Sequence, residues 1–302
     1  MRQVIERTTR LRAAVAALAV MLTAGALAAG PLDRSARASS APEAHAGQPM
    51  RHFVARGLYR STAVYDHQAW SWYQPTRLHS WIAPDGSGRQ RTLSGKPWFA
   101  SQEDRATWEA AGKPRFLAHG FRPHNDSQTL PPSSFDDLLY SPQPAAEMPA
   151  ETAALVDWLL DLAKQPSRGG GNGFESSVKT LELVTELLRN PALSAAQRLA
   201  LYEAEISIEG VEVLGSATDA AGREGTAIAA ESANSGALTR YSILVEEASG
   251  RIFESEALRL APLPYQHEWA GPQLESRTTY LQDGVASPGA FEKKSRKRSH
   301  RR

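Results

Sequence analysis

His119, His124 and Asp126 are the residues whose types and spacing come closest to a metal site in this sequence. Two imidazoles and a carboxylate can bind one divalent cation. Their spacing matches no zinc motif and the surrounding segment reads as a loop, so we predict no metal and no cofactor. The chain has no cysteine, which excludes disulfides, iron–sulfur centres, thiol catalysis and zinc held by thiolates.

Two glycine-rich stretches lack the residues that enzyme chemistry would need there. A phosphate-binding loop ends in Gly-Lys-Ser or Gly-Lys-Thr, whereas the run 169–173 continues with Phe174 and Glu175, whose carboxylate repels phosphate. Residues 85–88, Asp-Gly-Ser-Gly, suit a hairpin turn and not the nucleophile elbow of a serine hydrolase. We therefore predict a non-enzymatic protein and keep a hydrolase as the last of three alternatives.

An aromatic cluster between residues 70 and 81 is the candidate ligand-binding surface. Aromatic side chains at this density are most often core residues, but they can also line an apolar groove on the concave face of a curved antiparallel sheet. The expected groove-lining residues are Trp70, Trp72, Tyr73 and Trp81.

The C-terminal segment 293–302 carries +7 and no apolar residue, so we predict a disordered basic tail. Residues 1–28 carry +3, which leaves −9 for residues 29–292 in a chain of net charge +1. Each basic side chain near an anionic membrane contributes about 1 kcal/mol; a solvated tail without a specific partner is the alternative. The residues expected to contact an anionic membrane or wall polymer, in preference to nucleic acid, are Lys293, Lys294, Arg296, Lys297, Arg298, Arg301 and Arg302.

The N-terminus has the pattern of an export signal. A basic stretch at residues 2–12 precedes residues 13–29, which carry no charge, and residues 26–28, Ala-Leu-Ala, fit a small-x-small cleavage site. A helix of this length spans about 26 Å, close to the thickness of the hydrocarbon core. Residues 1–29 are therefore a signal peptide or a membrane anchor, and residues 30–50, rich in Ala, Ser and Pro, are predicted to be a disordered linker.

The middle of the chain predicts helices. Apolar residues share one face of residues 151–164, and a second apolar stripe runs from residue 174 to residue 188. Pro191 ends the second helix. Ser194 and Gln197 then form a capping box, which starts a third helix that reaches about residue 206.

The C-terminal part predicts consecutive antiparallel strands. Turns at residues 219–222 and 248–250 contain glycine, which adopts positive φ at no steric cost, and Asp219 can bond its own backbone. Strands joined by such tight turns are antiparallel. The predicted strands are 211–218, 223–230, 238–246, 251–260 and 277–281.

The N-terminal part predicts further strands. Residues 58–93 are aromatic and strand-like, with a strand, a glycine turn and a returning strand between Trp81 and Arg89. Residues 96–124 read as irregular apart from a short helix near 103–111. We therefore predict one α+β domain at residues 51–287: a curved antiparallel sheet, or half-barrel, packed with helices and preceded by one N-terminal hydrophobic helix. The tail follows at residues 288–302.

Seven segments of the sequence carry a family resemblance: 81–89, 130–139, 187–189, 200–202, 210–228, 249–252 and 280–285. They resemble a large actinobacterial family of uncharacterised proteins with one membrane span and an exterior domain. The resemblance covers about residues 60–287. It implies an exterior domain similar to the half-barrels of lipoprotein carriers and of periplasmic regulators of sigma-factor signalling, and it implies no catalytic residues.

The sequence thus leads us to expect an extracytoplasmic domain, membrane-anchored or secreted, that binds an apolar ligand or a protein partner on a curved sheet. Lipid, a lipoprotein or a membrane protein are the expected partners. The alternative is a regulator of envelope or sigma-factor signalling that acts through a membrane partner.

Overall fold

In the computed structural model of this protein, all described residues lie between Met50 and Ala286. The expected signal or anchor at 1–29, the linker up to residue 49 and the basic tail, with its residues Lys293 to Arg302, lie outside the described residues, as do His119 and His124. In the part that is described, no helix is long and apolar enough to cross a membrane. The structure describes residues 50–65, 68–83, 87–114, 125–130, 143–165, 175–190, 192–233, 236–262 and 271–286.

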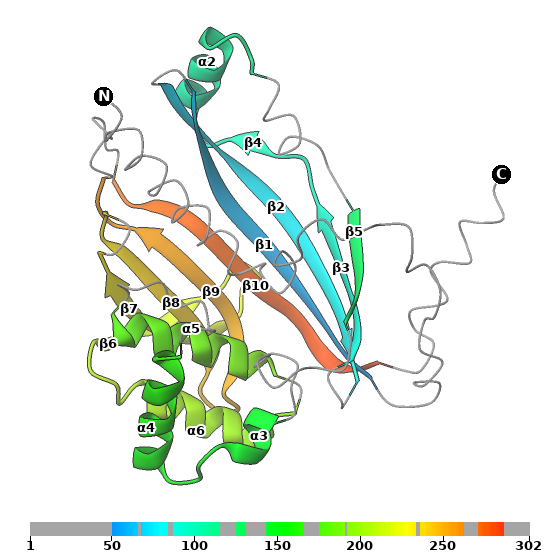
Figure 1. Ribbon diagram of the computed structural model, residues 1–302, viewed down its shortest axis with the longest axis vertical. Coiled ribbons are helices and arrows are strands. Elements are labelled where there is room, and N and C mark those ends of the chain that lie inside the picture. Colours follow the sequence, from blue (N-terminus) through cyan, green and yellow to red (C-terminus); the bar gives the residue numbers. More distant parts are fainter. Residues whose placement is uncertain are drawn as a thin grey trace, which may run out of the picture. The chain divides into compact units, whose positions relative to one another are not determined.

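The fold is α+β and is built on one large antiparallel sheet (Figure 1). Across the described ranges its strand order is β5-β3-β2-β1-β10-β9-β8-β7-β6, with β4 paired to β2, so the sheet is open and β5 and β6 are its edges. The strands are β1 (Met50–Tyr65), β2 (Gln68–Ile82), β3 (Gly88–Ser94), β4 (Trp98–Phe99), β5 (Asn125–Leu130), β6 (Val211–Thr218), β7 (Glu224–Ser232), β8 (Thr239–Glu246), β9 (Arg251–Arg259) and β10 (Gln273–Ala286).

The predicted C-terminal strands are confirmed as consecutive neighbours, from β6 to β9. The turn between β6 and β7 forms as its residues predict: the Asp219 carboxylate accepts hydrogen bonds from the backbone amides of Ala221 at 2.8 Å and Arg223 at 2.9 Å. Gly222 in this turn has φ +83°, which glycine adopts without strain. The fifth predicted strand is longer than expected. As β10 it pairs with β9 on one side and with β1 on the other, and so joins the two parts of the sheet.

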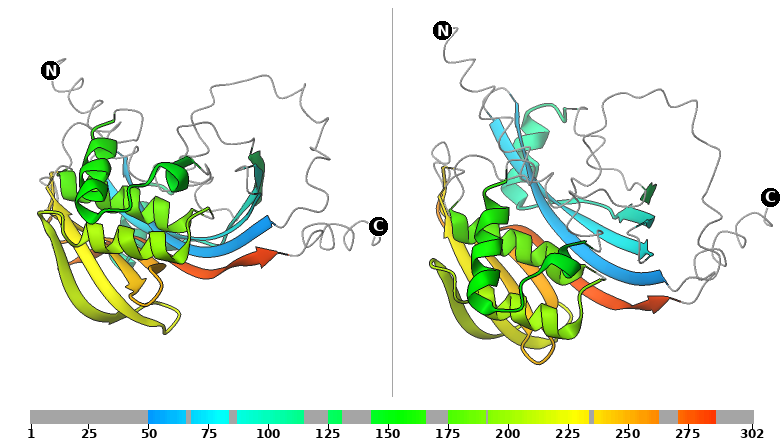
Figure 2. Two further views of the ribbon diagram at one scale, coloured as in Figure 1. Left: turned by 90° about the horizontal axis from the view of Figure 1, so that it is seen from below. Right: turned by 60° about the horizontal axis from the view of Figure 1, so that its bottom comes forward.

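Helices cover one face of the β7–β9 part of the sheet (Figure 2). The predicted capping box is confirmed, with the Ser194 hydroxyl accepting from the Gln197 amide at 3.2 Å and the Gln197 side chain accepting from the Ser194 amide at 3.0 Å. In Figure 2 the strands bend toward the side that carries the helices. The described helices are α2 (Gln102–Ala110), α3 (Gln143–Glu147), α4 (Thr152–Ala163), α5 (Ser176–Arg189) and α6 (Ala195–Glu205).

Two N-terminal features differ from the sequence expectation. The first strand begins at Met50, eight residues before the predicted strand-like segment, and Asp126 lies in strand β5 where a loop is predicted. β5 is a short polar edge strand whose only described partner is β3, so it lacks the apolar alternation by which a half-buried strand is recognised. The strand and the returning strand between Trp81 and Arg89 are confirmed as β2 and β3, and the turn residues 84–86 lie outside the described residues.

Candidate ligand-binding site

The four predicted groove-lining residues lie in separate places. Trp70 and Trp72 are buried near the N-terminal end of β2, where they pack with Phe99 and with Trp108 of α2. They therefore belong to a small core that fixes α2 to the sheet. The ring of Tyr73 lies 6.0 Å from that of Trp98. Because successive side chains of a strand point to opposite faces, Tyr73 faces away from Trp70 and Trp72.

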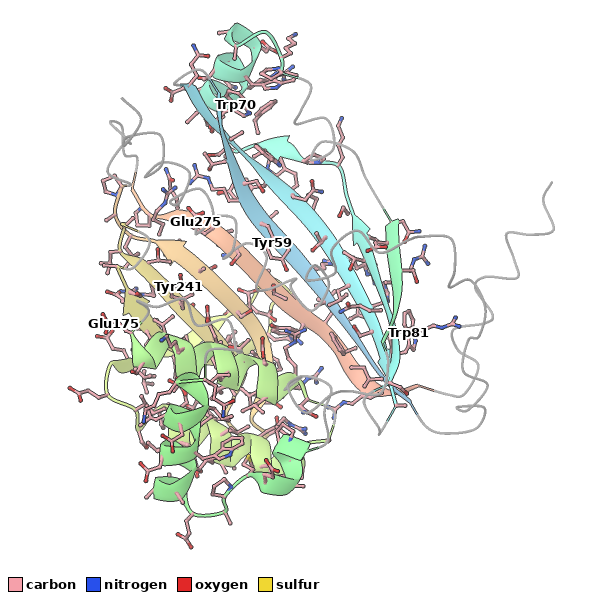
Figure 3. The ribbon with its side chains drawn as sticks, in the orientation of Figure 1. Tyr59, Trp70, Trp81, Glu175, Tyr241 and Glu275 are labelled. Carbon is pink, nitrogen blue, oxygen red and sulfur yellow. The ribbon has the colours of Figure 1, made fainter. Side chains whose placement is uncertain are left out.

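Trp81 lies near the other end of β2 (Figure 3). Its ring stacks on His52 of β1 at 4.7 Å and on His79 at 5.7 Å between centroids. His52 is not among the residues predicted from the sequence. A histidine in an alternating strand gives no sign of its partners until the strand register is known, and the register places His52 directly opposite Trp81.

Three side chains with raised pKa values, Tyr59, Glu182 and Tyr241, lie on the side of the sheet that faces α5. We call this side the α5 side. Arg189, the last residue of α5, identifies this side, because its guanidinium lies 5.5 Å from the ring of Phe53 and 5.2 Å from that of Tyr280. Alternation then assigns to the α5 side every second residue of the neighbouring strands.

One row of cross-strand partners on the α5 side has a tyrosine near each end and small residues between them. Tyr59 of β1 pairs with Ser276 of β10, Ser276 with Ala257 of β9, and Ala257 with Tyr241 of β8. Figure 3 labels Tyr59 and Tyr241 on either side of β9 and β10. Ser276 and Ala257 are thus the small residues that separate the two aromatic rings in this row.

Contacts hold the ring of Tyr59 in place, and the pKa values of both tyrosines of this row are raised. The Tyr59 hydroxyl lies 3.4 Å from Thr278 Oγ1, and its ring lies over Gly57, where any side chain would collide with it. Burial raises the pKa of Tyr59. Burial also raises the pKa of Tyr241, with a further contribution from the carboxylates of Glu182 and Glu275. The rings are therefore neutral over the physiological pH range.

A cluster of charged side chains lies beside Tyr59, where β1 and β10 cease to pair. Glu275 Oε1 lies 2.9 Å from Arg259 Nε and 3.4 Å from Arg60 Nη1, and both guanidiniums also bond the amide oxygen of Gln273. The arginine side chains are only 7% and 9% exposed. Two nearly buried cations thus share one carboxylate. Next to them, the Tyr73 hydroxyl donates a hydrogen bond to the Leu274 carbonyl at 3.3 Å.

Glu182 brings a carboxyl group of α5 to the same side. Burial raises its pKa to about 7, Glu186 one turn later raises it further, and Lys179 opposes the shift. A group with this pKa exchanges its proton near neutral pH. Perturbed ionisable groups concentrate at functional sites more often than elsewhere, so Glu182 and Tyr241 mark the α5 side as the candidate site.

A separate cleft of about 570 Å³ lies between α4, the start of α5 and β7. Its apolar wall comes from Val156, Leu160, Ile208 and neighbouring alanines, and glutamates form part of its lining. The size suits a small molecule. None of the perturbed groups of the α5 side lines this cleft, so we assign the candidate site to the α5 side.

The α5 side offers aromatic rings, hydroxyls and the guanidinium of Arg259, with the Ser255 hydroxyl 3.1 Å from that of Tyr280. Within the described ranges, no group of three or more His, Asp or Glu residues could hold a metal ion. No protein-family model matches this chain, and a search of curated proteins finds no relative.

Proposed function

We propose that this protein is a non-enzymatic binding domain that holds an apolar ligand across strands β8, β9, β10 and β1 on the α5 side. The observation that carries the proposal is the row from Tyr59 to Tyr241, in which the small residues Ser276 and Ala257 separate two aromatic rings. Ligand sites are commonly lined by aromatic side chains with a few polar groups that fix orientation. Arg259 and Tyr280 supply such groups beside the row.

We infer that the bent sheet is a half-barrel wrapped around helices α4, α5 and α6, preceded by a hydrophobic N-terminal helix that exports or anchors the domain outside the cytoplasm. Within the sheet α5 packs mainly on β7, β8 and β9, and its last residue, Arg189, reaches Phe53 of β1 and Tyr280 of β10. The same face therefore continues across β10 and β1, away from the body of α5. That continuation is the space we assign to the ligand.

A matched pair of variants tests the proposal. Ser276 and Ser242 are both half-buried serines of the sheet, but Ser276 lies in the tyrosine row and Ser242 on the opposite face, next to Tyr241 in β8. The full chain, purified from a cell envelope, is extracted with organic solvent and the extract is analysed by mass spectrometry. We expect wild type and Ser242→Phe to release an apolar compound in stoichiometric amount, and Ser276→Phe to release little.

Two results would contradict the proposal. One is wild-type protein that carries no apolar compound after purification without detergent. The other is equal loss in the two variants, which would mean that any bulky substitution disturbs the sheet. Circular dichroism and melting temperatures of both variants establish that each is folded.

A further inference from the structure

The strands β1, β2 and β3 are basic, although residues 29–292 as a whole are acidic. They contain no aspartate or glutamate, and their arginines are Arg51, Arg56, Arg60, Arg77, Arg89 and Arg91. Asp66 and Asp85 fall between these strands in the sequence, outside the described residues. Residues 29–292 together carry −9, so the positive charge of these three neighbouring strands is a local feature of the sheet.

Strand register gathers much of this charge on the face that points away from α5. Phe53 lies beneath Arg189 of α5, so its neighbour His52 points to the opposite side. His52 pairs with Trp81, and Trp81 with Arg89. Two rows on, Arg56 pairs with Arg77. We call this surface the basic face; its residues are His52, Arg56, Arg77, His79, Trp81, Arg89 and Arg91.

The basic face combines exposed charge with a fixed aromatic patch. Arg56 and Arg77 are exposed, and their direct pairing places like charges side by side, an arrangement that costs stability. The rings of His52, His79 and Trp81 lie nearly parallel, with angles of 9° to 13° between their planes. A pair of like charges that lowers the stability of the free protein is expected at a surface where an anionic partner neutralises both charges.

We propose that the basic face docks on a lipid bilayer that contains anionic headgroups. The arginines are spread over three strands of an extended face, which suits a surface of many headgroups. Tryptophan is enriched where proteins meet the membrane interface. Proteins that bind single-stranded nucleic acid use free aromatic faces for stacking on bases, whereas these three rings stack on one another.

The position of β1 in the chain agrees with this partner. β1 begins at Met50, and residues 30–49 separate it from the expected anchor at 1–29. Twenty residues reach at most about 70 Å when extended, so a domain tethered in this way stays within reach of the membrane surface. The docking is independent of the proposed apolar ligand, because the basic face and the α5 side are opposite faces of the sheet.

Vesicle binding by the full chain tests the docking. Binding is measured by co-sedimentation with vesicles of phosphatidylcholine alone and with vesicles that contain phosphatidylglycerol as well. The ratio of the two binding constants isolates the charge-dependent part, because an apolar N-terminal segment inserts into both. One charge near an anionic surface changes binding about fivefold, so Arg56→Gln with Arg77→Gln should lower the ratio by about 25-fold, with or without residues 288–302.

The controls separate docking from net charge and from misfolding. Arg105→Gln removes an exposed charge from α2 and should leave the ratio nearly unchanged, whereas Arg56→Lys with Arg77→Lys should keep it. A drop of about fivefold with Arg105→Gln, the effect of one charge, would overturn the proposal in favour of net charge alone. Tighter binding to single-stranded DNA or to a polyglutamate peptide than to the anionic vesicles, lost in the same double variant, would overturn it in favour of that partner.

Discussion

Arg56 of β1 and Arg77 of β2 are direct partners in the antiparallel ladder, and both side chains are exposed. Within the described residues neither forms an ion pair with a carboxylate. Like charges directly opposite one another destabilise a sheet by a few tenths to about 1 kcal/mol. The pair therefore lowers the free energy of unfolding locally, and interactions elsewhere in the fold compensate for this loss.

The first prediction concerns this pair. Arg77→Gln should raise the free energy of unfolding by a few tenths to about 1 kcal/mol, because it removes the repulsion and keeps a long polar side chain. Urea denaturation followed by circular dichroism measures the change. Arg105→Gln, which removes a charge with an oppositely charged neighbour on its own helix, should change stability less and in the opposite direction. A lower stability of Arg77→Gln would mean that the two arginines are not in repulsive contact.

The second prediction concerns Glu205, which is fully buried between α5 and α6. Burial raises its pKa to about 8, although the Thr180 hydroxyl donates a hydrogen bond to Glu205 Oε1 at 3.1 Å and opposes the shift. The folded protein therefore holds a proton that the unfolded chain, with an ordinary value of 4.5, releases. Stability from this group is full below pH 4.5 and falls as the pH rises toward 8.

Replacing Glu205 with Gln tests the pH dependence. The amide keeps an oxygen that accepts from Thr180 and carries no ionisable proton, so the fall of the melting temperature between pH 5 and pH 8 should become shallower. Some slope should remain, because the pKa of Glu182 is raised to about 7 and acts in the same direction. Calorimetry at several pH values measures how the melting temperature depends on pH. If this dependence were the same in wild type and variant, Glu205 would be ionised in the folded state.

The third prediction compares two turn glycines with positive φ. Gly222, at +83°, has open space where a side chain would begin, whereas a Cβ on Gly250, at +63°, would lie 2.5 Å from the backbone carbon of Arg198 in α6. Gly222→Ala should cost about 1–2 kcal/mol of backbone strain. Gly250→Ala should cost about 1–3 kcal/mol more, because α6 must move. Equal losses in urea titrations would mean that the β8–β9 turn does not pack on α6.

The C-terminal hairpins could be predicted from the sequence because their turns are encoded locally. Asp219 and Gly222 make one turn and Gly250 the other, and no distant residue is needed to recognise them. The pairing of β1 with β10 joins residues more than 200 positions apart, and no local pattern specifies it. The short polar strand β5 likewise depends on β3 for its existence.

The candidate site could not be predicted for the same reason. The tyrosine row exists only when four strands are in register, and Tyr59 and Tyr241 are far apart in the sequence. The aromatic cluster that the sequence marks out is divided by strand alternation, with Trp70 and Trp72 on one face and Tyr73 and Trp81 on the other. The absence of acidic residues from β1, β2 and β3 can be read from the sequence, but which arginines share a face cannot.

The central claim is that an apolar ligand lies on the α5 side, and photocrosslinking tests it most directly. Benzoylphenylalanine replaces Tyr59 in one full-length variant and Ser242, on the opposite face, in another. After irradiation in the cell envelope and purification, we expect intact-mass analysis to find an apolar adduct on the Tyr59 variant and none on the Ser242 variant. Adducts of equal yield at both positions, or none at Tyr59, would contradict the account.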